Sequence, residues 1–524
     1  MAKRSTRGTA ALAVLGAAGS DGRPVDIVRH RGRRALVNRD LTPLEATVAD
    51  LLAIRSALVA AGIPFHLVQT DHARPVLAVD ERDRERVAEA LATGLRREPF
   101  YVGRSGHRAV LAAEGLDSAL ATAKRVKLFR PRIEPVGGLS YGAAGAVRLE
   151  FWQFDDDSVE LPRENAFLRR TVPRAELRDA EIVEHGVAWR TFSPMFDRLV
   201  SEVPFDIDLV FSWVDGSDIE FQRARAQRMS AYVVGEGDDH EARFRQIDEL
   251  KYALRSVHLF APWVRRIFIA TDSPAPAWLL EHPKVTIVRS EEFFADTSVL
   301  PTHNSQAVES QIHRIPGLAE HYLYSNDDMF FGRPVSPSMF FSPGGVTKFV
   351  EARTRIGLGA PALERSGFEN SARVNREVLR DRFGVTITRH LEHCAAPFVK
   401  SVVSELETEL AQDFARTAAS RFRSATDISV TNSLYHYYAL TTGRAVVQEH
   451  AKVLYVDTTL QHGVDLMQGL LRSRSKDMFC LNDGSFPEIE AEERTAIVQD
   501  FLEKYFPIVP PWERAATSTN SQAV

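Results

Sequence analysis

Three apolar segments in the middle of the chain each end in acidic residues. Aspartate is a common turn residue, so any single one of these positions would suit a turn better than a ligand site. The adjacent pair after the third segment is more informative, because two neighbouring carboxylates can hold Mg²⁺ or Mn²⁺ against a diphosphate. The acidic residues are Asp215, Asp272, Asp327 and Asp328.

The elements that position these residues are strands that alternate with helices. DIDLVFSWV is a near-continuous apolar run, typical of a strand buried on both faces, and RRIFIATD, VTIVRS and HYLYSNDD predict further strands. After the first strand, Ile247, Leu250, Leu254 and Val257 recur at helical spacing, which predicts an amphipathic helix ending near Pro262. The alternation favours an α/β fold with a Rossmann-like, doubly wound, mostly parallel sheet and helical additions. Because ligands bind beyond the carboxyl ends of such strands, we expect the acidic residues to meet there.

The composition is that of a globular protein with more than one domain. The 524 residues include 65 Lys and Arg against 70 Asp and Glu, a formal charge of −5, which argues against a nucleic-acid partner. No segment has the roughly 18 consecutive apolar residues of a membrane-spanning helix. The two cysteines, Cys394 and Cys480, are too few for a disulfide framework and fit no zinc-site spacing, so one optional disulfide is all they allow.

The chain divides into four predicted parts. Residues 1–40 form a basic leader that we expect to be disordered, and its weak apolar stretch resembles a secretory signal only superficially. Residues 41–200 predict an accessory α/β domain, residues 205–485 contain the acidic strand ends, and residues 486–524 predict a C-terminal helix with a disordered tail. We expect a cytoplasmic protein, which the basic leader could hold at the inner face of the cell membrane.

Several long blocks resemble the Stealth proteins. These are bacterial capsule and exopolysaccharide phosphotransferases, together with the animal N-acetylglucosamine-1-phosphotransferase α/β subunit. The resemblance covers about residues 205–485 and is specific, because several long blocks occur in the same order. The blocks are DLVFSWVDGSD (208–218), ELKYALRSVHLFAPWVRRIFIATD (249–272), LPTHNSQAVESQIHRIPGLAEHYLYSNDDMFFG (300–332) and FCLND (479–483).

The resemblance implies transfer of a sugar 1-phosphate from a nucleotide diphosphate sugar, with UDP as the expected nucleotide. The acceptor would be a hydroxyl of a glycan, which could be lipid-linked, and the product a phosphodiester. The essential histidine of the family maps best onto His393, with His390 as its competitor, although HCAAP (393–397) keeps only part of the family's His-x-Pro-x-Pro. The essential arginine maps onto Arg423, with Arg421 as its competitor. The implied catalytic residues are His393, Arg423, Asp215 and Asp328.

Other positions in the matching blocks are expected to bind metal or substrate. Lys251 and Arg255 lie four residues apart on one helical face, and we expect one of them to be solvated. Glu309 and His313 form a similar pair, and Arg314 follows them as a group that could neutralise phosphoryl oxygens. The expected ligands of Mg²⁺ or Mn²⁺ are Asp327, Asp328 and Asp483. The expected substrate-binding residues are Trp213, Gly216, Lys251, Arg255, Asn304, Ser305, Glu309, His313, Arg314, Asn326 and Asn482.

Chemical reasons support several of these assignments. Histidine can take a proton from a hydroxyl near neutral pH, and the guanidinium fork of arginine binds two phosphoryl oxygens at once. Gly216 permits close approach of a ligand to the backbone. Asn304 or Ser305 is expected to cap a helix whose N-terminus could attract an anion.

Two other functions fit the same residues. A metal-dependent glycosyltransferase would use an Asp-Asp strand end equally well, but it would react at the sugar carbon and release a nucleoside diphosphate. A non-catalytic glycan-binding subunit of an envelope-polymer complex would bind sugar nucleotides without turnover. The nucleotide that is released separates these functions, whereas the sequence predicts neither the donor sugar nor the oligomeric state.

Overall fold

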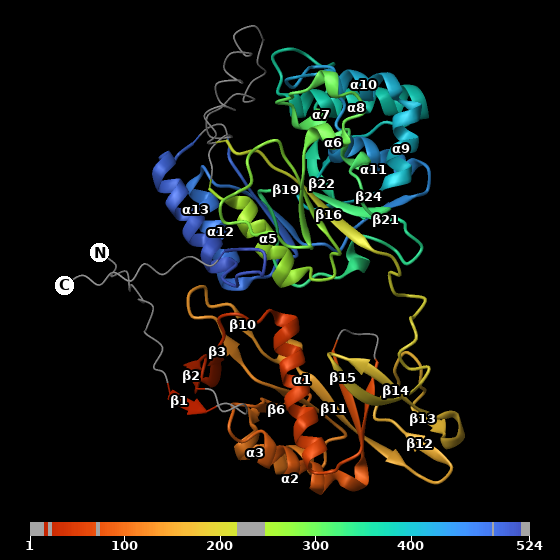
Figure 1. The fold of residues 1–524 in the computed structure, drawn as a ribbon, viewed down its shortest axis with the longest axis vertical. Coiled ribbons are helices and arrows are strands. Elements are labelled where there is room, and N and C mark those ends of the chain that lie inside the picture. Colours follow the sequence, from red (N-terminus) through yellow and green to blue (C-terminus); the bar gives the residue numbers. More distant parts are fainter. Residues whose placement is uncertain (1–14, 19–23, 70–73, 217–246, 485–486, 515–524) are drawn as a thin grey trace, which may run out of the picture. The chain divides into compact units, whose positions relative to one another are not determined.

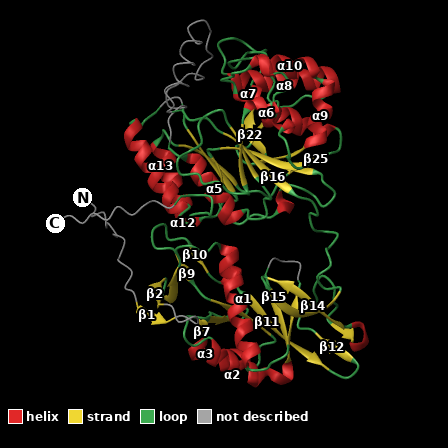
Figure 2. Ribbon diagram, viewed as in Figure 1, coloured by secondary structure: helices red, strands yellow, loops and turns green. Residues whose placement is uncertain are grey.

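A computed structural model describes residues 15–18, 24–69, 74–216, 247–484 and 487–514. The chain forms two compact units, Met1–Arg198 and Leu199–Val524, and the division falls close to the predicted boundary (Figure 1). Both units mix helices with strands, which confirms a mixed α/β protein (Figure 2). Within the described ranges no helix is both long and apolar enough to cross a membrane. The end of the first matching block and the polar tail fall outside these ranges.

The first unit packs three helices against a mixed sheet in one apolar core. The helices are α1 (Pro43–Ala60), α2 (Arg84–Gly94) and α3 (Ala112–Leu120). The sheet runs β13-β12-β11-β8-β6-β7, with β5 parallel to β11 and paired to β4. Its strands are β4 (Phe65–Val68), β5 (Val76–Asp80), β6 (Tyr101–Gly103), β7 (Val110–Leu111), β8 (Arg125–Phe129), β11 (Val147–Phe154), β12 (Ser158–Glu160) and β13 (Thr171–Pro173). A separate hairpin is formed by β14 (Arg178–Glu184) and β15 (Val187–Ser193).

A second sheet in this unit includes part of the expected leader. Its order is β1-β2-β3-β9-β10. Val28, Ala35 and Ile133 are buried together, so the apolar residues between the arginines of this segment form a small core. Residues 24–37 were predicted to be disordered because of their many arginines, but the apolar residues between these arginines form strands. The strands are β1 (Leu15–Ala18), β2 (Pro24–His30), β3 (Arg33–Val37), β9 (Arg132–Ile133) and β10 (Ser140–Tyr141).

The second unit is built on a five-stranded sheet of order β18-β17-β16-β19-β24. The first four strands in this order are parallel, and β24 is antiparallel to β19. The chain therefore leaves β16 toward β17 on one side and later returns to place β19 on its other side. Ligands of open α/β sheets bind at such a reversal, beyond the carboxyl ends of the two strands. The strands are β16 (Ile207–Ser212), β17 (Ile267–Ala270), β18 (Val285–Val288), β19 (His321–Asn326) and β24 (Ala396–Val399).

Helices cover both faces of this sheet. Val210 and Tyr322 share a core with the group α7–α11, while Leu209 and Leu323 in the same strands are equally buried. Because side chains alternate along a strand, the second pair faces the opposite side, where α5 lies (Figure 1). The helices are α5 (Glu249–Phe260), α6 (Ser290–Phe293), α7 (Ser305–Glu309), α8 (Gly367–Phe383), α9 (Lys400–Glu409), α10 (Ala411–Ala419), α11 (Tyr435–Thr441), α12 (Gln461–Ser473) and α13 (Ala491–Tyr505).

Smaller sheets extend the second unit. The sheet β20-β27-β26 begins directly after Asp328, and the ring of Phe479 in this sheet packs edge-on against Phe501 of the C-terminal helix α13. Residues 487–514 therefore belong to the same folded body. The strands of this sheet are β20 (Met329–Phe331), β26 (Val453–Asp457) and β27 (Met478–Asn482). Two further pairs are β21 (Thr347–Phe349) with β25 (Ala445–Val447), and β22 (Glu351–Arg355) with β23 (Arg389–Leu391).

A histidine buried in the core of the second unit makes the folding stability of that unit depend on pH. His436 on α11 packs against Phe349 and Phe398, and burial lowers its pKa to about 3. An unfolded histidine takes up a proton below about pH 6.5, so folding stability is lost as the pH falls below that value. We expect wild-type protein to lose about 1 kcal/mol more than His436→Phe between pH 7.5 and pH 5.5. Urea unfolding of both proteins at the two pH values measures this difference, and equal losses would contradict it.

Candidate active site

The carboxyl ends of β16 and β19 lie side by side. Ser212 pairs with Asn326 in the parallel register, so the segments that follow leave the sheet together. Trp213 is buried, and its N–H donates to the carbonyl of Ala270 at the end of β17 over 3.2 Å. The N–H of Asp215 donates to Ser273 Oγ over 2.9 Å. Gly216, the last described residue of this segment, is also buried. The structure thus brings the predicted strand ends to one edge.

Asp327 and Asp328 form the turn between β19 and β20. The carbonyl of Asp328 accepts from the N–H of Leu481 at 3.0 Å, and its carboxylate accepts from Cys480 Sγ at 3.3 Å. Burial, and then the neighbouring charge of Asp328, raise the pKa of Asp327 to about 7. This pair of carboxyl groups is therefore held close together and partly buried, at the edge where β16 also ends.

Glu249, the first residue of α5, is a third partly buried carboxyl group near this turn. Burial, and then the charge of Asp327, raise the pKa of Glu249 to about 8, with a further contribution from Asp483. The N–H of Ile247 donates to Glu249 Oε2 over 3.1 Å. Glu249 cannot be recognised as a site residue from the sequence, because an acidic residue in the first turn of a helix is common.

The structure does not assemble the predicted three-carboxylate metal set. In the described part of the chain, no three His, Cys, Asp or Glu side chains are placed to hold a metal ion. Asp483 instead pairs with Arg494 at 2.8 Å and accepts from Thr458 Oγ1 at 2.7 Å. Asp327 and Asp328 still suit Mg²⁺ or Mn²⁺, because Mg²⁺ usually takes one or two carboxylates and completes its shell with phosphate and water. A cation would also offset the repulsion that raises the pKa of Asp327.

His393 lies at the same edge of the sheet. Ala396 of β24 pairs with Tyr324 in the antiparallel register, so the chain just before β24 runs past the carboxyl end of β19. The ring of His393 lies 5.3 Å from that of Tyr455 and 5.9 Å from that of Phe368, and burial lowers its pKa. A neutral imidazole at this position can accept a proton. Cys394, next to His393 in the sequence, and Cys480 are both free thiols, so the optional disulfide is absent.

His390, the competing histidine, stacks on the same aromatic ring, that of Phe368. Its ring centroid lies 4.6 Å from that of Phe368. Burial, then the charges of His393 and Arg373, lower the pKa of His390 to about 4. His390 is the more deeply buried of the two, so His393 is the better placed to meet a substrate.

Arg423 points toward α7, whereas its competitor Arg421 is exposed. Arg423 Nη2 donates to Ser305 Oγ over 3.0 Å. Asn304 holds the loop that carries this arginine, because its Nδ2 contacts the carbonyl of Ser420 at 3.1 Å and Asp427 Oδ2 at 2.8 Å. Asn304 also caps α7, accepting from the N–H of Gln306 at 3.1 Å. Asn304 therefore positions Arg423, and α7 is too short to form an anion site alone.

A partly buried glutamate links Arg423 to the end of β19. Glu309 accepts from Thr431 Oγ1 at 2.5 Å and from the hydroxyl of Tyr324 at 3.3 Å, and that hydroxyl also lies 2.8 Å from Asn326 Oδ1. Burial raises the pKa of Glu309, while the charge of Arg423 partly opposes this effect. Asn326, Glu309 and Arg423 thus belong to one connected polar network.

The first turn of α8 joins the two halves of the site. Phe368 contacts the ring of His393, and the neighbouring Gly367 packs against Arg423. A Cβ atom at residue 367 would lie 2.7 Å from Arg423 Cδ, so a larger residue would displace the arginine. His393 and Arg423, which lie 30 residues apart in the sequence, therefore flank a single helical turn.

Two basic residues predicted to reach diphosphate are used elsewhere. Arg255 is 3% exposed and forms an ion pair with Glu513 at 2.6 Å, and it also donates to the carbonyl of Phe506 at 2.8 Å. Lys251 lies 3.5 Å from the same Glu513. The expectation that one of the pair is solvated is wrong, because the chain after α13 covers this face of α5. Arg255 fastens the C-terminal segment to the unit.

The predicted pair of Glu309 and His313 does not form. The helix α7 ends at Glu309, and His313 instead contacts Glu407 of α9 at 2.8 Å. Arg314 binds the same carboxylate at 2.8 Å, so both residues tie α9 to the turn after α7.

Two other predicted residues have structural contacts. Asp272 accepts from the N–H of Ser290 at 2.8 Å, which fixes the start of α6. The carbonyl of Asn482 accepts from the N–H of Thr458 at 2.9 Å.

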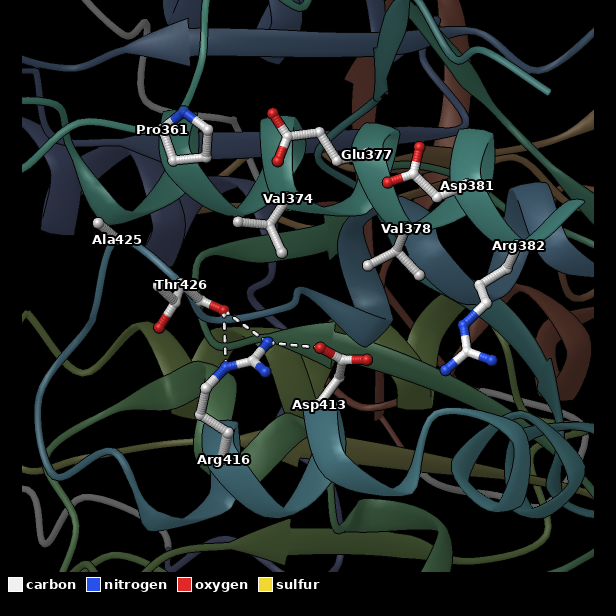
Figure 3. A pocket seen from close by; sticks show the side chains of 10 residues that line it. All are labelled: Pro361, Val374, Glu377, Val378, Asp381, Arg382, Asp413, Arg416, Ala425 and Thr426. Atoms are coloured by element: carbon white, nitrogen blue, oxygen red, sulfur yellow. Dashed lines mark hydrogen bonds and ion pairs between the residues drawn. The ribbon is translucent and has the colours of Figure 1, made fainter. Parts of the chain in front are cut away.

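A pocket of about 450 Å³ lies behind the loop that carries Arg423. It opens between α8, α10 and residues Ala425 and Thr426, and Figure 3 shows Arg416 bonded to Thr426 and Asp413 at its rim. None of the predicted catalytic, metal or substrate residues lines it. The pocket is therefore separate from the edge where the strand ends meet.

The chain matches models of all four conserved regions of one family. The matches are Stealth protein CR1, conserved region 1 (residues 205–233), CR2, conserved region 2 (243–349), CR3, conserved region 3 (392–440) and CR4, conserved region 4 (468–523). These regions contain every predicted site residue, from Trp213 to Asp483.

Similar proteins extend this match to almost the whole chain. The "Exopolysaccharide phosphotransferase CpsY" of Mycobacterium tuberculosis (strain ATCC 25618 / H37Rv) is 57% identical over 94% of this chain and 93% of its own length. An "Exopolysaccharide phosphotransferase" of Nocardia farcinica is 54% identical over 91% and 89%, and SCO6021 of Streptomyces coelicolor, also named an exopolysaccharide phosphotransferase, is 36% identical over 91% and 92%. A solved structure of the galactosyltransferase LgtC with donor and acceptor sugar analogs covers 58% of this chain and 96% of that chain, at a TM-score of 0.29 and 11% identity.

Proposed function

The chain belongs to the Stealth family, and we propose that it is an exopolysaccharide phosphotransferase that moves a sugar 1-phosphate from a nucleotide diphosphate sugar to a glycan hydroxyl. One observation supports this reaction above the others. The segment carrying His393 runs beside the carboxyl end of β19, where the Asp327–Asp328 turn lies. A base for the acceptor and carboxylates suited to a diphosphate-bound cation therefore lie at the same edge of the sheet.

In the proposed reaction the acceptor oxygen attacks the phosphorus that carries the sugar. His393 takes the proton of the acceptor hydroxyl as the new oxygen–phosphorus bond forms. The bond between this phosphorus and the bridging oxygen breaks, and its electron pair leaves with the nucleoside monophosphate. Arg423, oriented by Ser305, neutralises the equatorial phosphoryl oxygens, which carry the charge in such a transition state.

The remaining residues at this edge of the sheet would bind the cation and the donor and hold the neighbouring side chains in position. Asp327 and Asp328 would hold Mg²⁺ or Mn²⁺, which supplies charge neutralisation on a diphosphate when it is bound. Asp215, which follows β16, would face the ribose or the cation, and Trp213 and Gly216 shape the wall beside it. Glu309 fixes Tyr324 and Asn326 next to the Asp-Asp turn. The donor is expected to be UDP-linked, and the acceptor could be lipid-linked.

The nucleotide product tests the proposed function directly. Purified protein would be incubated with Mn²⁺, a panel of UDP-sugars and oligosaccharide acceptors, and the released nucleotide identified by chromatography. We expect UMP together with a phosphodiester-linked product. Release of UDP would instead make the protein a glycosyltransferase, and the absence of any nucleotide product with every donor would favour a binding subunit.

Binding of the cation can be measured without turnover. We expect wild-type protein with saturating UDP to bind Mn²⁺ in calorimetry, and Asp328→Asn to weaken this binding by about tenfold or more, because one anionic ligand is lost. Asp272→Asn is a matched control, since Asp272 also follows a strand but only fixes the start of α6. Equal Mn²⁺ affinity in wild type and Asp328→Asn would remove Asp328 from the metal site.

A further inference from the structure

Three arginines gather around the first half of α8, outside the residues assigned above. Arg373 lies on α8 and is 3% exposed, Arg376 follows on the same helix, and Arg365 lies in the loop before it. Burial, and then the positive charge of Arg365, lower the pKa of Arg373, and Arg376 adds to the effect. The three side chains therefore concentrate positive charge at a buried position, which folding alone does not favour.

The contacts of Arg373 leave its charge poorly balanced. Its Nη1 donates to the carbonyl of Glu369 at 2.8 Å, but the carboxylate of that residue is 3.9 Å away and about half exposed. The Nε atoms of Arg373 and Arg365 are buried and have no hydrogen-bond acceptor among the described residues. Among the described residues, Arg376 donates to two carbonyls, those of Gly357 and Gly359, at 3.0 and 3.1 Å, and to no carboxylate. Buried guanidinium groups of this kind are matched by oxygens that carry negative charge.

The cluster can be reached from solvent on one side. Arg365 and Arg376 are only partly buried, while the exposed segment 357–360 covers Arg373. A Cβ atom at residue 357 would lie 2.5 Å from Arg373 Nη2, so glycine there lets the backbone close directly over the guanidinium. An anion could approach on the side where Arg365 and Arg376 are partly exposed.

The position of the cluster connects it with the proposed reaction. Arg373 lies close enough to His390 for its charge to lower the pKa of that histidine, and His390 stacks on the ring that also contacts His393. We infer that Arg365, Arg373 and Arg376 bind a phosphoryl group of a substrate beside the catalytic histidine. This inference rests on the proposed function. The group is either a phosphodiester of an acceptor that has already received a sugar phosphate, or the diphosphate of the donor.

The two candidate ligands, the acceptor phosphodiester and the donor diphosphate, imply different properties of the enzyme. A site for a phosphodiester would favour acceptors that already carry the product linkage, so the enzyme would extend a chain of phosphodiester-linked sugars. A site for the diphosphate would instead strengthen donor binding and would not distinguish between acceptors.

The test is equilibrium binding by calorimetry to wild type and Arg373→Gln, with two probes, the methyl diester of glucose 1-phosphate and UDP. Arg380→Gln is the matched control, because Arg380 lies on α8 but is exposed and pairs only with Asp381. We expect Arg373→Gln to weaken diester binding by about tenfold or more. A loss confined to UDP would also support a phosphoryl site and would identify the donor as its ligand.

Unchanged binding of both probes, or an equal loss in Arg380→Gln, would overturn the inference. Arg365→Gln, at a partly exposed position, provides the same test if Arg373→Gln does not fold. Because these measurements need no turnover, their failure is distinct from failure of the proposed function, which the nucleotide released decides.

Discussion

His393→Gln is expected to lower the turnover rate by about 10² to 10⁴, the usual contribution of a general base. Glutamine keeps the size and polarity of the side chain but cannot take the proton of the acceptor. Because His393 acts before the nucleotide leaves and is not assigned to the donor, the affinity for UDP should stay unchanged. Steady-state kinetics with a saturating acceptor, and calorimetry with UDP, measure the two effects separately.

The pH profile distinguishes a base from a structural histidine. Burial lowers the pKa of His393, so the wild-type kcat/KM should fall only when the pH drops below about 6.5, where the imidazole begins to take up a proton. This acidic limb should be absent from the residual activity of His393→Gln. His462→Gln, an exposed histidine on α12, is the control and should behave as wild type. Full turnover in His393→Gln together with a large loss in His390→Gln would move the assignment to His390.

The strand ends could be predicted from the sequence because their signal is local. An unbroken apolar run such as Leu209–Phe211 can be buried on both faces only as an inner strand, and the polar residue that ends it marks the carboxyl edge. The parallel order then brings Asp215 and Asp327 to that edge without further information. The mixed α/β fold and the family followed from these same segments and their order.

The partners of long polar side chains could not be predicted in this way. Arg255 and Lys251 occupy the helical face that the spacing indicates, but the residue that binds them, Glu513, lies more than 250 residues away. Similarly, a helix continuing past Glu309 would have paired it with His313, but the chain turns and α9 supplies Glu407 instead. Such pairings depend on tertiary packing and leave no periodic pattern in the sequence.

Glu249 and Phe368 show the same limit at the site itself. Glu249 reads as an ordinary acidic residue of a first helical turn, and only its burial beside Asp327 distinguishes it. Phe368 reads as one apolar residue near a helix start, yet its ring contacts both His390 and His393. Residues that position catalytic groups are therefore identified from contacts, whereas the groups themselves can be predicted from their chemistry.

Arg423→Lys is expected to lower the turnover rate by about 10³ or more, the scale of an arginine that stabilises phosphoryl transfer. Lysine keeps the charge but cannot hold two phosphoryl oxygens in one plane. Ser305 would still offer its hydroxyl, and the loop would still be held by Asn304, so the fold should be unchanged. Single-turnover kinetics measure the loss at the chemical step, and thermal unfolding verifies the fold.

Arg421→Lys provides the matched control for this prediction. Arg421 lies two residues away in the same loop, and its carbonyl accepts from the N–H of His303 at 2.8 Å, while its side chain is exposed. The same substitution there should leave the rate within about twofold of wild type, because a solvated charge contributes little to the bound phosphoryl group. If Arg421→Lys caused the larger loss, the essential arginine would be Arg421, and the network of Arg423, Ser305 and Glu309 would have only a structural role.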